Sequence, residues 1–303
     1  MATVVTTEFS ARMIHDLSQP QRDRLAFIDL RLRLLGELRR QHLIDRFEIQ
    51  AAAATRDIAL YKELAGDNID YDTSSKTYVA SEAFKALFDT PTALAISWLM
   101  TGLGDGEPRQ QAPGIPIDFP DQLSWPKIDI LSVVTQAINK PCPVLISYES
   151  LNGSSTRVIS PFALIDNGLR WHVRGNDRKT GQFRDFVLTR ISKAELLPDA
   201  PILDHERGDQ DIEWVHIVEI ILVPHPDQPR PEVTVLDYGM VNGYLKVNLR
   251  AATVGYTLRK WSVDCSPDHS LRGHEHRLWM KNWRVLYGVR NAVLAPGFKE
   301  PED

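Results

Sequence analysis

Two Asn-Gly dipeptides, Asn152-Gly153 and Asn167-Gly168, constrain the fold of this chain more than any other feature. They are flanked by segments rich in β-branched residues, which cover 144–151, 154–165 and 169–174. Because both residues of an Asn-Gly pair tolerate positive φ, the pair favours a tight turn between two antiparallel strands. The pattern therefore predicts a meander of four or five strands, which is typical of a small β-barrel.

The next predicted hairpin runs from Gly168 to Ile191, with a tight turn at Lys179-Thr180-Gly181. Its first strand, 169–174, alternates apolar residues with basic ones, among them His172 and Arg174. Side chains alternate between the two faces of a strand, so this strand has one apolar face and one basic face. The basic face has only scattered acids near it in the sequence.

Like charges gathered on one small sheet repel each other, so we expect an anion to bind this basic face. Planar guanidinium groups suit phosphates, and the ring of Tyr148 is able to stack on a base. The alternative is a solvated face whose Arg stems cover apolar surface. The predicted ligand-binding residues are Ser147, Tyr148, Arg157, His172, Arg174, Arg184 and Arg190.

The N-terminal part predicts a winged helix-turn-helix. A short amphipathic helix at 40–47, a three-residue turn and a longer helix at 51–64 have the helix-turn-helix spacing. Two short strands, 68–71 and 76–79, then predict a hairpin wing. The helices expected around this unit cover 22–35, 81–88 and 91–103.

The second helix of the helix-turn-helix begins with small and polar residues. Such side chains let a helix end approach base edges, and Arg56 is able to reach a guanine or a phosphate. The alternative is three ordinary core helices with a surface hairpin. The predicted DNA-binding residues are Arg39, Arg40, Gln50, Ala53, Thr55, Arg56, Ser74, Ser75 and Lys76.

The remaining patterns divide the chain into three domains and a linker. A stretch rich in Pro and Gly follows residue 104. We expect a DNA-binding domain at 1–104, a linker at 105–126, a barrel domain at 127–200 and a C-terminal domain at 212–296. The barrel domain begins with a helix at 128–138, and the C-terminal domain contains strands at 215–223 and 245–249 and a helix at 252–260.

Charge and composition narrow the function. The net charge of −5 argues against a globally basic nucleic-acid binder, but 22–46 holds seven Arg against four acids. The two cysteines, Cys142 and Cys265, are too few for a disulfide framework. Without a signal peptide or a membrane-length apolar run, we expect a cytoplasmic, nucleoid-associated protein that contacts no membrane.

No motif for catalysis is present. There is no nucleophile elbow, phosphate-cradling loop or dinucleotide fingerprint, so we expect neither an enzyme nor a cofactor. His269, His274 and His276 with Cys265 fit no metal-ligand spacing, and we expect them in a surface loop.

The chain resembles the WYL-domain transcriptional regulators of bacteria in three stretches, 39–79, 160–164 and 168–191. The Trp-Tyr-Leu triplet that names the family reads Trp171-His172-Val173 here. The resemblance implies an α+β multidomain fold with an N-terminal winged helix-turn-helix, a central SH3/Sm-like antiparallel β-barrel and a C-terminal α/β dimerisation domain.

The segments 170–174 and 183–186 are similar to the branch that represses bacteriophage-defence operons such as BREX and CBASS. That likeness implies a homodimer on double-stranded operator DNA, with a nucleotide or single-stranded nucleic-acid effector at the WYL barrel. The run of alanines at 51–54 departs from the Ser-rich version of the family and leaves the operator sequence open. The rivals are an activator or accessory factor, and an enzyme acting on a phosphorylated substrate.

Overall fold

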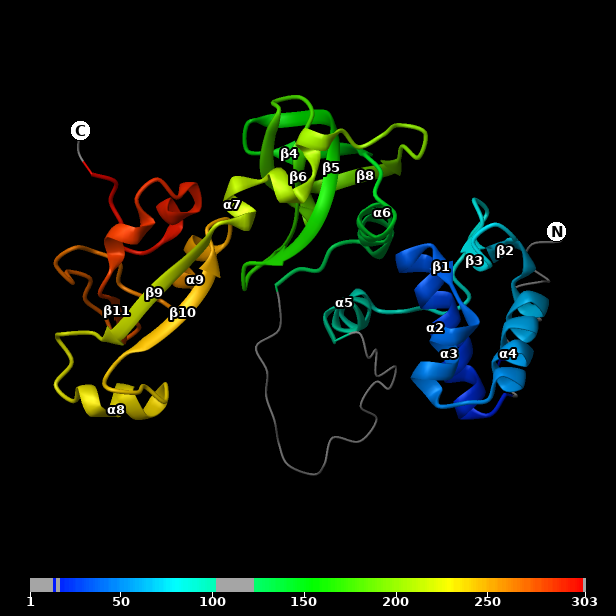
Figure 1. Cartoon of the computed structure of the whole chain (residues 1–303), viewed down its shortest axis with the longest axis horizontal. Helices are drawn as coiled ribbons and strands as arrows, with labels where there is room; N and C mark the ends of the chain where they lie inside the picture. The colour runs from blue at the N-terminus through cyan, green and yellow to red at the C-terminus, as the bar shows by residue number, and fades with distance from the viewer. Residues whose placement is uncertain (1–12, 15–16, 102–122, 302–303) are drawn as a thin grey trace. The chain divides into compact units, whose positions relative to one another are not determined.

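A computed structural model of the chain describes residues 13–14, 17–101 and 123–301 (Figure 1). The chain forms two compact units. The first comprises Met1–Asp121, Trp125–Pro141 and Lys193–Leu196, and the second comprises Gln122–Ser124, Cys142–Ser192 and Leu197–Asp303. The predicted linker lies outside the described residues as far as residue 122.

The first unit contains the predicted winged helix-turn-helix. Its strands form a sheet in the order β1-β3-β2. The predicted bounds of the helix-turn-helix pair are confirmed for both helices, α3 and α4. In chain order the elements are α2 (Gln19–Leu35), β1 (Glu37–Leu38), α3 (Arg40–Phe47), α4 (Ala51–Leu64), β2 (Ile69–Asp72), β3 (Thr77–Ala80) and α5 (Thr92–Thr101).

The core of this unit is built from the apolar stripes of α2 and α4. Leu25, Ile28 and Leu32 of α2 pack in one cluster with Ile58 and Tyr61 of α4, and all five are buried. Their spacing of three and four residues places them on one face of each helix. The helix α2 ends where Gly36 adopts φ 69° and donates its N–H to the Leu32 carbonyl.

The expectation of a helix at 81–88 is wrong, because long-range side chains bind the backbone there. The buried carboxylate of Asp29 accepts the N–H groups of Leu87 and Phe88, at 3.0 and 3.2 Å. It also accepts the Tyr61 hydroxyl at 2.6 Å. The side chain of Asn68 accepts the N–H of residue 85 at 2.8 Å. These bonds hold the segment in turns and extended chain.

Helix α6 (Ile128–Asn139) packs against α2 within the first unit, although the sequence placed it in the barrel domain. Thr135, Gln136 and Asn139 donate side-chain hydrogen bonds of 2.6–2.8 Å to the last carbonyls of α2, those of residues 33–35. The last carbonyls of a helix have no partner within it, so α6 satisfies the end of α2.

The predicted meander forms a curved antiparallel sheet in the order β7-β6-β5-β4-β8, of which the strands β4 to β7 belong to the second unit (Figure 1). Both Asn-Gly turns are confirmed, with Gly153 at φ 115° and Gly168 at φ 83°. A register shift between Pro161 and Ala163 interrupts the longest strand, β5. The strands are β4 (Val144–Ser150), β5 (Gly153–Asp166), β6 (Trp171–Asp177), β7 (Gln182–Val187) and β8 (Ile191–Leu196).

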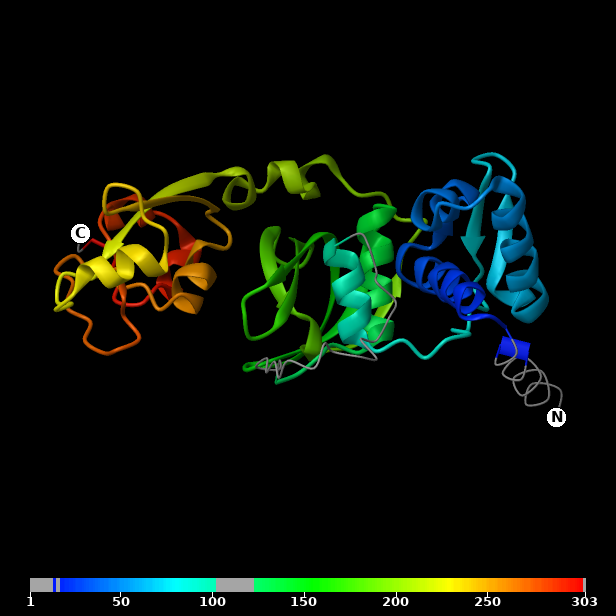
Figure 2. The ribbon, with the colours of Figure 1, turned by 90° about the horizontal axis from the view of Figure 1, so that it is seen from below.

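The C-terminal part of this unit has a sheet in the order β10-β9-β11. Strands β9 and β10 run side by side as an antiparallel pair (Figures 1 and 2). The strand expected at 215–223 begins later, because residue 215 closes a short helix, and β11 was not predicted. The elements are α7 (Ile212–Val215), β9 (Ile217–Pro224), α8 (Pro231–Asp237), β10 (Leu245–Arg250), α9 (Val254–Lys260) and β11 (Leu278–Met280). In the described chain, no helix is both long and apolar enough to cross a membrane.

The Asp29 carboxylate should be a main determinant of stability in the first unit. Replacing it by Ala leaves the Tyr61 hydroxyl proton and two backbone N–H groups without an acceptor, so Asp29→Ala should lower the free energy of unfolding by about 2–3 kcal/mol. Urea denaturation measures this loss. Asp29→Asn keeps an acceptor oxygen and should lose less, while Glu63→Ala on the exposed face of α4 should change stability by less than about 0.5 kcal/mol. A loss for Asp29→Ala no larger than that of Glu63→Ala would contradict this role.

Candidate nucleic-acid interface and ligand pocket

Helix α4 presents one face to solvent, and that face begins with small side chains. An ion pair of 2.6 Å between Arg24 of α2 and Asp57 fixes the buried face of α4. The opposite face therefore carries the exposed residues Ala51, Ala52, Thr55, Arg56 and Ala59. The turn before α4 places Glu48 in the left-handed region, with φ 51°. The first turns of α4 are thus accessible to a large partner.

Most of the predicted DNA-binding residues flank this face. Gln50 precedes α4 and is exposed, whereas Ala53 is half-buried. Arg40 donates to the Thr55 hydroxyl at 3.4 Å and so joins the start of α3 to α4. Arg39 donates to Thr77 of the wing at 3.3 Å. These two arginines lie between α4 and the wing and are exposed.

The wing differs from the expectation in one respect. The hydroxyls of Ser74 and Ser75 both donate to the carboxylate of Asp72, at 2.6 and 2.7 Å. The hydrogen bonds from Ser74 hold the pKa of Asp72 below its usual range. Both hydroxyl protons are therefore in use within the turn. Lys76, exposed with φ 54°, carries a positive charge at this turn.

The register of the barrel divides the predicted anion-binding residues between two faces. Residues opposite each other on neighbouring strands share a face, and so do residues two apart on one strand. Asp177 lies opposite Ile159 of β5 and Gln182 of β7, so these three side chains share a face. Arg157 is two residues from Ile159 and Arg184 is two residues from Gln182, so both also lie on the face of Asp177. His172 and Arg174 lie an odd number of residues before Asp177 along β6, so their side chains point to the other face. The expectation that all these residues converge on one face is wrong.

The first strand of the barrel also differs from the expectation. Tyr148 is buried, its ring meets Phe186 edge-on with centroids 5.2 Å apart, and its hydroxyl accepts the Val187 N–H at 3.3 Å. Its ring therefore belongs to the core and cannot stack on a base. Ser147 is half-buried on the opposite face of β4. Arg190 lies half-buried in a short 3-10 helix after β7.

Two of the predicted basic residues of the barrel, Arg157 and Arg174, are paired with acids. Arg157 binds Asp177 at 2.5 Å. Arg174 is 6% exposed and binds two carboxylates, Asp211 at 2.6 Å and Asp185 at 2.8 Å. Burial alone would lower the pKa of Arg174, but the two acids hold it above its usual value. These cations are neutralised inside the molecule, and the expectation that their repulsion requires an external anion is wrong.

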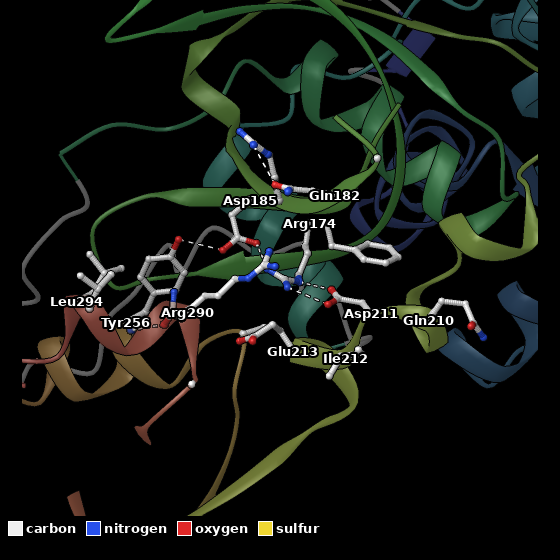
Figure 3. Close-up of a pocket in the computed structure, with 17 residues that line it drawn as sticks. Arg174, Gln182, Asp185, Gln210, Asp211, Ile212, Glu213, Tyr256, Arg290 and Leu294 are labelled. Atoms are coloured by element: carbon white, nitrogen blue, oxygen red, sulfur yellow. Dashed lines mark hydrogen bonds and ion pairs between the residues drawn. The ribbon is translucent and has the colours of Figure 1, made fainter. Parts of the chain in front are cut away.

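A pocket of about 800 Å³ opens beside Arg174 (Figure 3). The Tyr256 hydroxyl donates to Asp185 at 3.0 Å and so extends the Arg174 network along the wall. Arg290 extends into the pocket toward Arg174 (Figure 3). The positively charged lining residues are Arg174, Arg184 and Arg290, and the negatively charged ones are Asp185, Asp211 and Glu213. Three positive and three negative charges leave the wall neutral overall.

Several residues of this pocket were not predicted as site residues. Asp211, Tyr256, Arg290 and Asn291 come from the segment before β9, from α9 and from a late 3-10 helix. They carry no motif, and only the folded chain brings them to β6 and β7. The sequence offered one signal: 199–237 contains ten Asp and Glu against two Arg, and Asp211 is one of these acids.

His172 is buried against α9. Its ring stacks on Tyr256, with centroids 5.4 Å apart and planes at 26°. Burial lowers the pKa of His172, and the neighbouring Arg170 acts in the same direction. The neutral imidazole is therefore favoured, and His172 does not add to the positive charge of the barrel.

The described residues contain no group of three or more His, Cys, Asp or Glu arranged to hold a metal ion. His276 instead hydrogen-bonds the Ser262 carbonyl at 2.8 Å, and both cysteines are free.

Models of known protein families match three consecutive parts of the chain. They are the BrxR transcriptional regulator winged helix-turn-helix domain at 20–100, the WYL domain at 129–196 and the BrxR transcriptional regulator C-terminal dimerization domain at 217–286. The DNA-binding transcriptional repressor CapW of Pseudomonas aeruginosa is 34% identical over 255 residues, which cover 78% of this chain and 81% of that protein. The chain belongs to the CapW family.

Two further CapW repressors have similar matches. The CapW of Escherichia coli (strain KTE188) is 32% identical, and the match covers 89% of this chain and 91% of that protein. The CapW of Stenotrophomonas maltophilia is 31% identical, and the match covers 84% of this chain and 88% of that protein. The predicted family and three-domain α+β fold are confirmed. The relatives are named as repressors, which agrees with the predicted regulator and not with the enzyme alternative.

The buried His172 should make stability depend on pH. Its lowered pKa means that, below the ordinary histidine pKa of about 6.5, the unfolded chain takes up a proton that the folded chain resists. Stability should therefore fall as the pH drops from 7.5 to 5.5. Denaturation at several pH values should show a shallower fall for His172→Gln, while His205→Gln at an exposed position keeps the wild-type slope. Equal slopes for all three proteins would rule out this contribution.

Proposed function

We propose that the protein is a homodimeric repressor that binds the operator of a phage-defence operon through its winged helix, in the cytoplasm at the nucleoid. A nucleotide or single-stranded nucleic acid, bound at the WYL barrel, modulates this binding. The observation that carries the proposal is the exposed N-terminal half of α4, where small side chains surround Arg56. The CapW relatives are DNA-binding transcriptional repressors, and this likeness supports the proposal.

The geometry around α4 suits a duplex. A helix end with small side chains approaches base edges closely, and an Arg beside it donates two hydrogen bonds to a guanine. Arg39, Arg40 and Lys76 lie on either side of that helix end and suit phosphates. The positive surplus of 22–46 thus gives a net acidic protein a locally basic surface.

Arg56 is the sharpest test of operator reading. If Arg56 reads a base, Arg56→Ala should weaken operator binding by about 1–3 kcal/mol and relax sequence preference at one position. Gel-shift titration on the protein's own upstream region measures this. Arg259→Ala removes the same charge from an exposed position on α9 and should leave affinity near wild type. Operator affinity unchanged in a folded Arg56→Ala protein would remove α4 from the reading surface.

The proposed dimer needs an apolar surface, but strand β9 of the C-terminal part turns most of its apolar side chains inward. Val218, Ile220 and Leu222 of β9 face the core. Exposed apolar side chains follow instead in 236–244, among them Leu236 at 79% and Val241 at 70% exposure. We therefore assign the proposed dimer contact to α8 and the turn after it. Two helix-turn-helix units at a fixed spacing require such a contact.

Charge introduced at this contact should separate the subunits. The double variant Leu236→Arg, Val241→Arg should shift the protein from dimer to monomer at micromolar concentration, because two cations would be buried without partners. Light scattering reports the mass, and Leu169→Arg, in an exposed turn of the barrel, serves as a control. A double variant that stays dimeric would place the contact elsewhere.

The proposed effector role keeps Arg184 and adds Arg290. Neither makes an ion pair within the described chain, and both line the pocket, as do the amides of Gln182 and Asn291. Arg184 and Arg290 thus have charge to offer a phosphate, whereas Arg174→Ala would leave two buried carboxylates unpaired. Substituting either exposed arginine is therefore the cleaner way to remove an effector response while operator binding is kept.

A further inference from the structure

The guanidinium of Arg174 donates two hydrogen bonds to one carboxylate and a single hydrogen bond to another. Its Nε and Nη2 atoms bind the two carboxylate oxygens of Asp211, at 2.6 and 3.1 Å, while Nη1 alone binds Asp185 at 2.8 Å. The edge formed by Nε and Nη2 is the two-pronged donor that carboxylates and phosphates share. Asp211 therefore fills the position that a phosphate ligand in this pocket would take (Figure 3).

The two acids differ in how firmly they are held. Asp185 lies in β7 directly opposite Arg174 in the ladder, and the Tyr256 hydroxyl binds its second oxygen. The ladder holds the backbone of Asp185 beside Arg174, and the Tyr256 hydroxyl holds its carboxylate. Asp211 lies between a 3-10 turn, Gly208–Gln210, and the four-residue helix α7. A segment without ladder hydrogen bonds moves at lower free-energy cost than a strand of a sheet.

Asp211 also determines the start of α7. Its side chain and its carbonyl both accept the N–H of Trp214, at 3.4 and 2.9 Å. Trp214 packs edge-on against Phe162 of β5, with centroids 5.5 Å apart. It is covered by Arg250 of β10, whose guanidinium lies 4.6 Å from the ring centroid and donates to the Trp214 carbonyl. A movement of Asp211 would therefore displace Trp214, which lies just before the start of β9.

We propose that Asp211 is a built-in competitor for the effector. A ligand phosphate takes Nε and Nη2 of Arg174 from Asp211, and the displaced carboxylate releases residues 208–216. The proposal rests on the proposed effector role of this pocket and names its regulation. With Asp211 displaced, Arg174 keeps Asp185 on Nη1, while Nε and Nη2 are free to donate to the phosphate.

This arrangement gives the ligand a differential affinity for two states. The phosphate binds the state in which Asp211 is out, and its observed affinity falls by the fraction of molecules in that state. Asp211→Asn keeps the size and capping oxygen of the side chain but removes the charge that competes. Since hydrogen bonds between charged groups are stronger than those to neutral groups, the variant should bind phosphate at least about tenfold more tightly.

Inorganic pyrophosphate and the full-length protein provide the test. Calorimetry should show at least about tenfold tighter binding for Asp211→Asn than for wild type. Hydrogen exchange of 208–216 should speed up in wild type with pyrophosphate and in Asp211→Asn without it. Asp204→Asn, which changes a 96% exposed acid in the same segment, should match wild type in both measurements. Asp211→Ser keeps a capping hydroxyl and should repeat the result if the Asn variant folds poorly.

Three outcomes would overturn the proposal. They are equal pyrophosphate affinity in wild type and Asp211→Asn, absence of binding to the variant, and binding to wild type that leaves exchange of 208–216 unchanged. Gel shifts of the same proteins keep this separate from the operator role. If Arg56→Ala keeps the pyrophosphate response but no longer binds the operator, the result supports both the role of Asp211 and the role of Arg56. If Arg56→Ala keeps the pyrophosphate response and still binds the operator, the role of Asp211 is retained and the role of Arg56 is contradicted.

Discussion

Strand β6 is buried along its whole length, and this constraint decides what its polar side chains can do. One face lies in the barrel core with Val173, and the other is covered by Tyr256 of α9 and by the segment that carries Asp211. A buried guanidinium needs its charge balanced and its donors filled, which is why Arg174 draws in acids from both sides. The C-terminal part of the chain is thereby fastened to the barrel.

Local patterns predicted the local structure well. The Asn-Gly turns, the bounds of α3 and α4 and the alternation of β6 all depend on neighbours within a few residues, and the structure has them. The segment 81–88 failed because Asp29 and Asn68, distant in sequence, satisfy its backbone. Composition within that segment contains nothing about those partners, so a helical pattern there was misleading.

The ligand site was predicted only in part, for a geometric reason. Alternation along β6 puts His172 and Arg174 on one face, but the face of Arg157 or Arg184 depends on strand register, which turn geometry sets. The acids that pair with these arginines lie on other strands and in the C-terminal part, so the sequence of the basic strand alone could not predict the ion pairs. The DNA-binding surface was easier, since its residues lie within one helix-turn-helix and its wing. Even there, the hydrogen bonds of Asp72 with Ser74 and Ser75 came from the folded turn.

The hydrogen bonds from α6 to the end of α2 bear on how the parts of such regulators can be exchanged. By sequence, α6 opens the WYL match at 129, yet Thr135, Gln136 and Asn139 complete the last turn of a winged-helix element. A DNA-binding module cut out before residue 127 would leave those carbonyls exposed and a core face of α2 bare. A chimera that swaps operator preference between relatives should therefore carry residues 128–139 along with the winged helix. The segment that such a chimera has to move is therefore larger than the winged-helix match at 20–100.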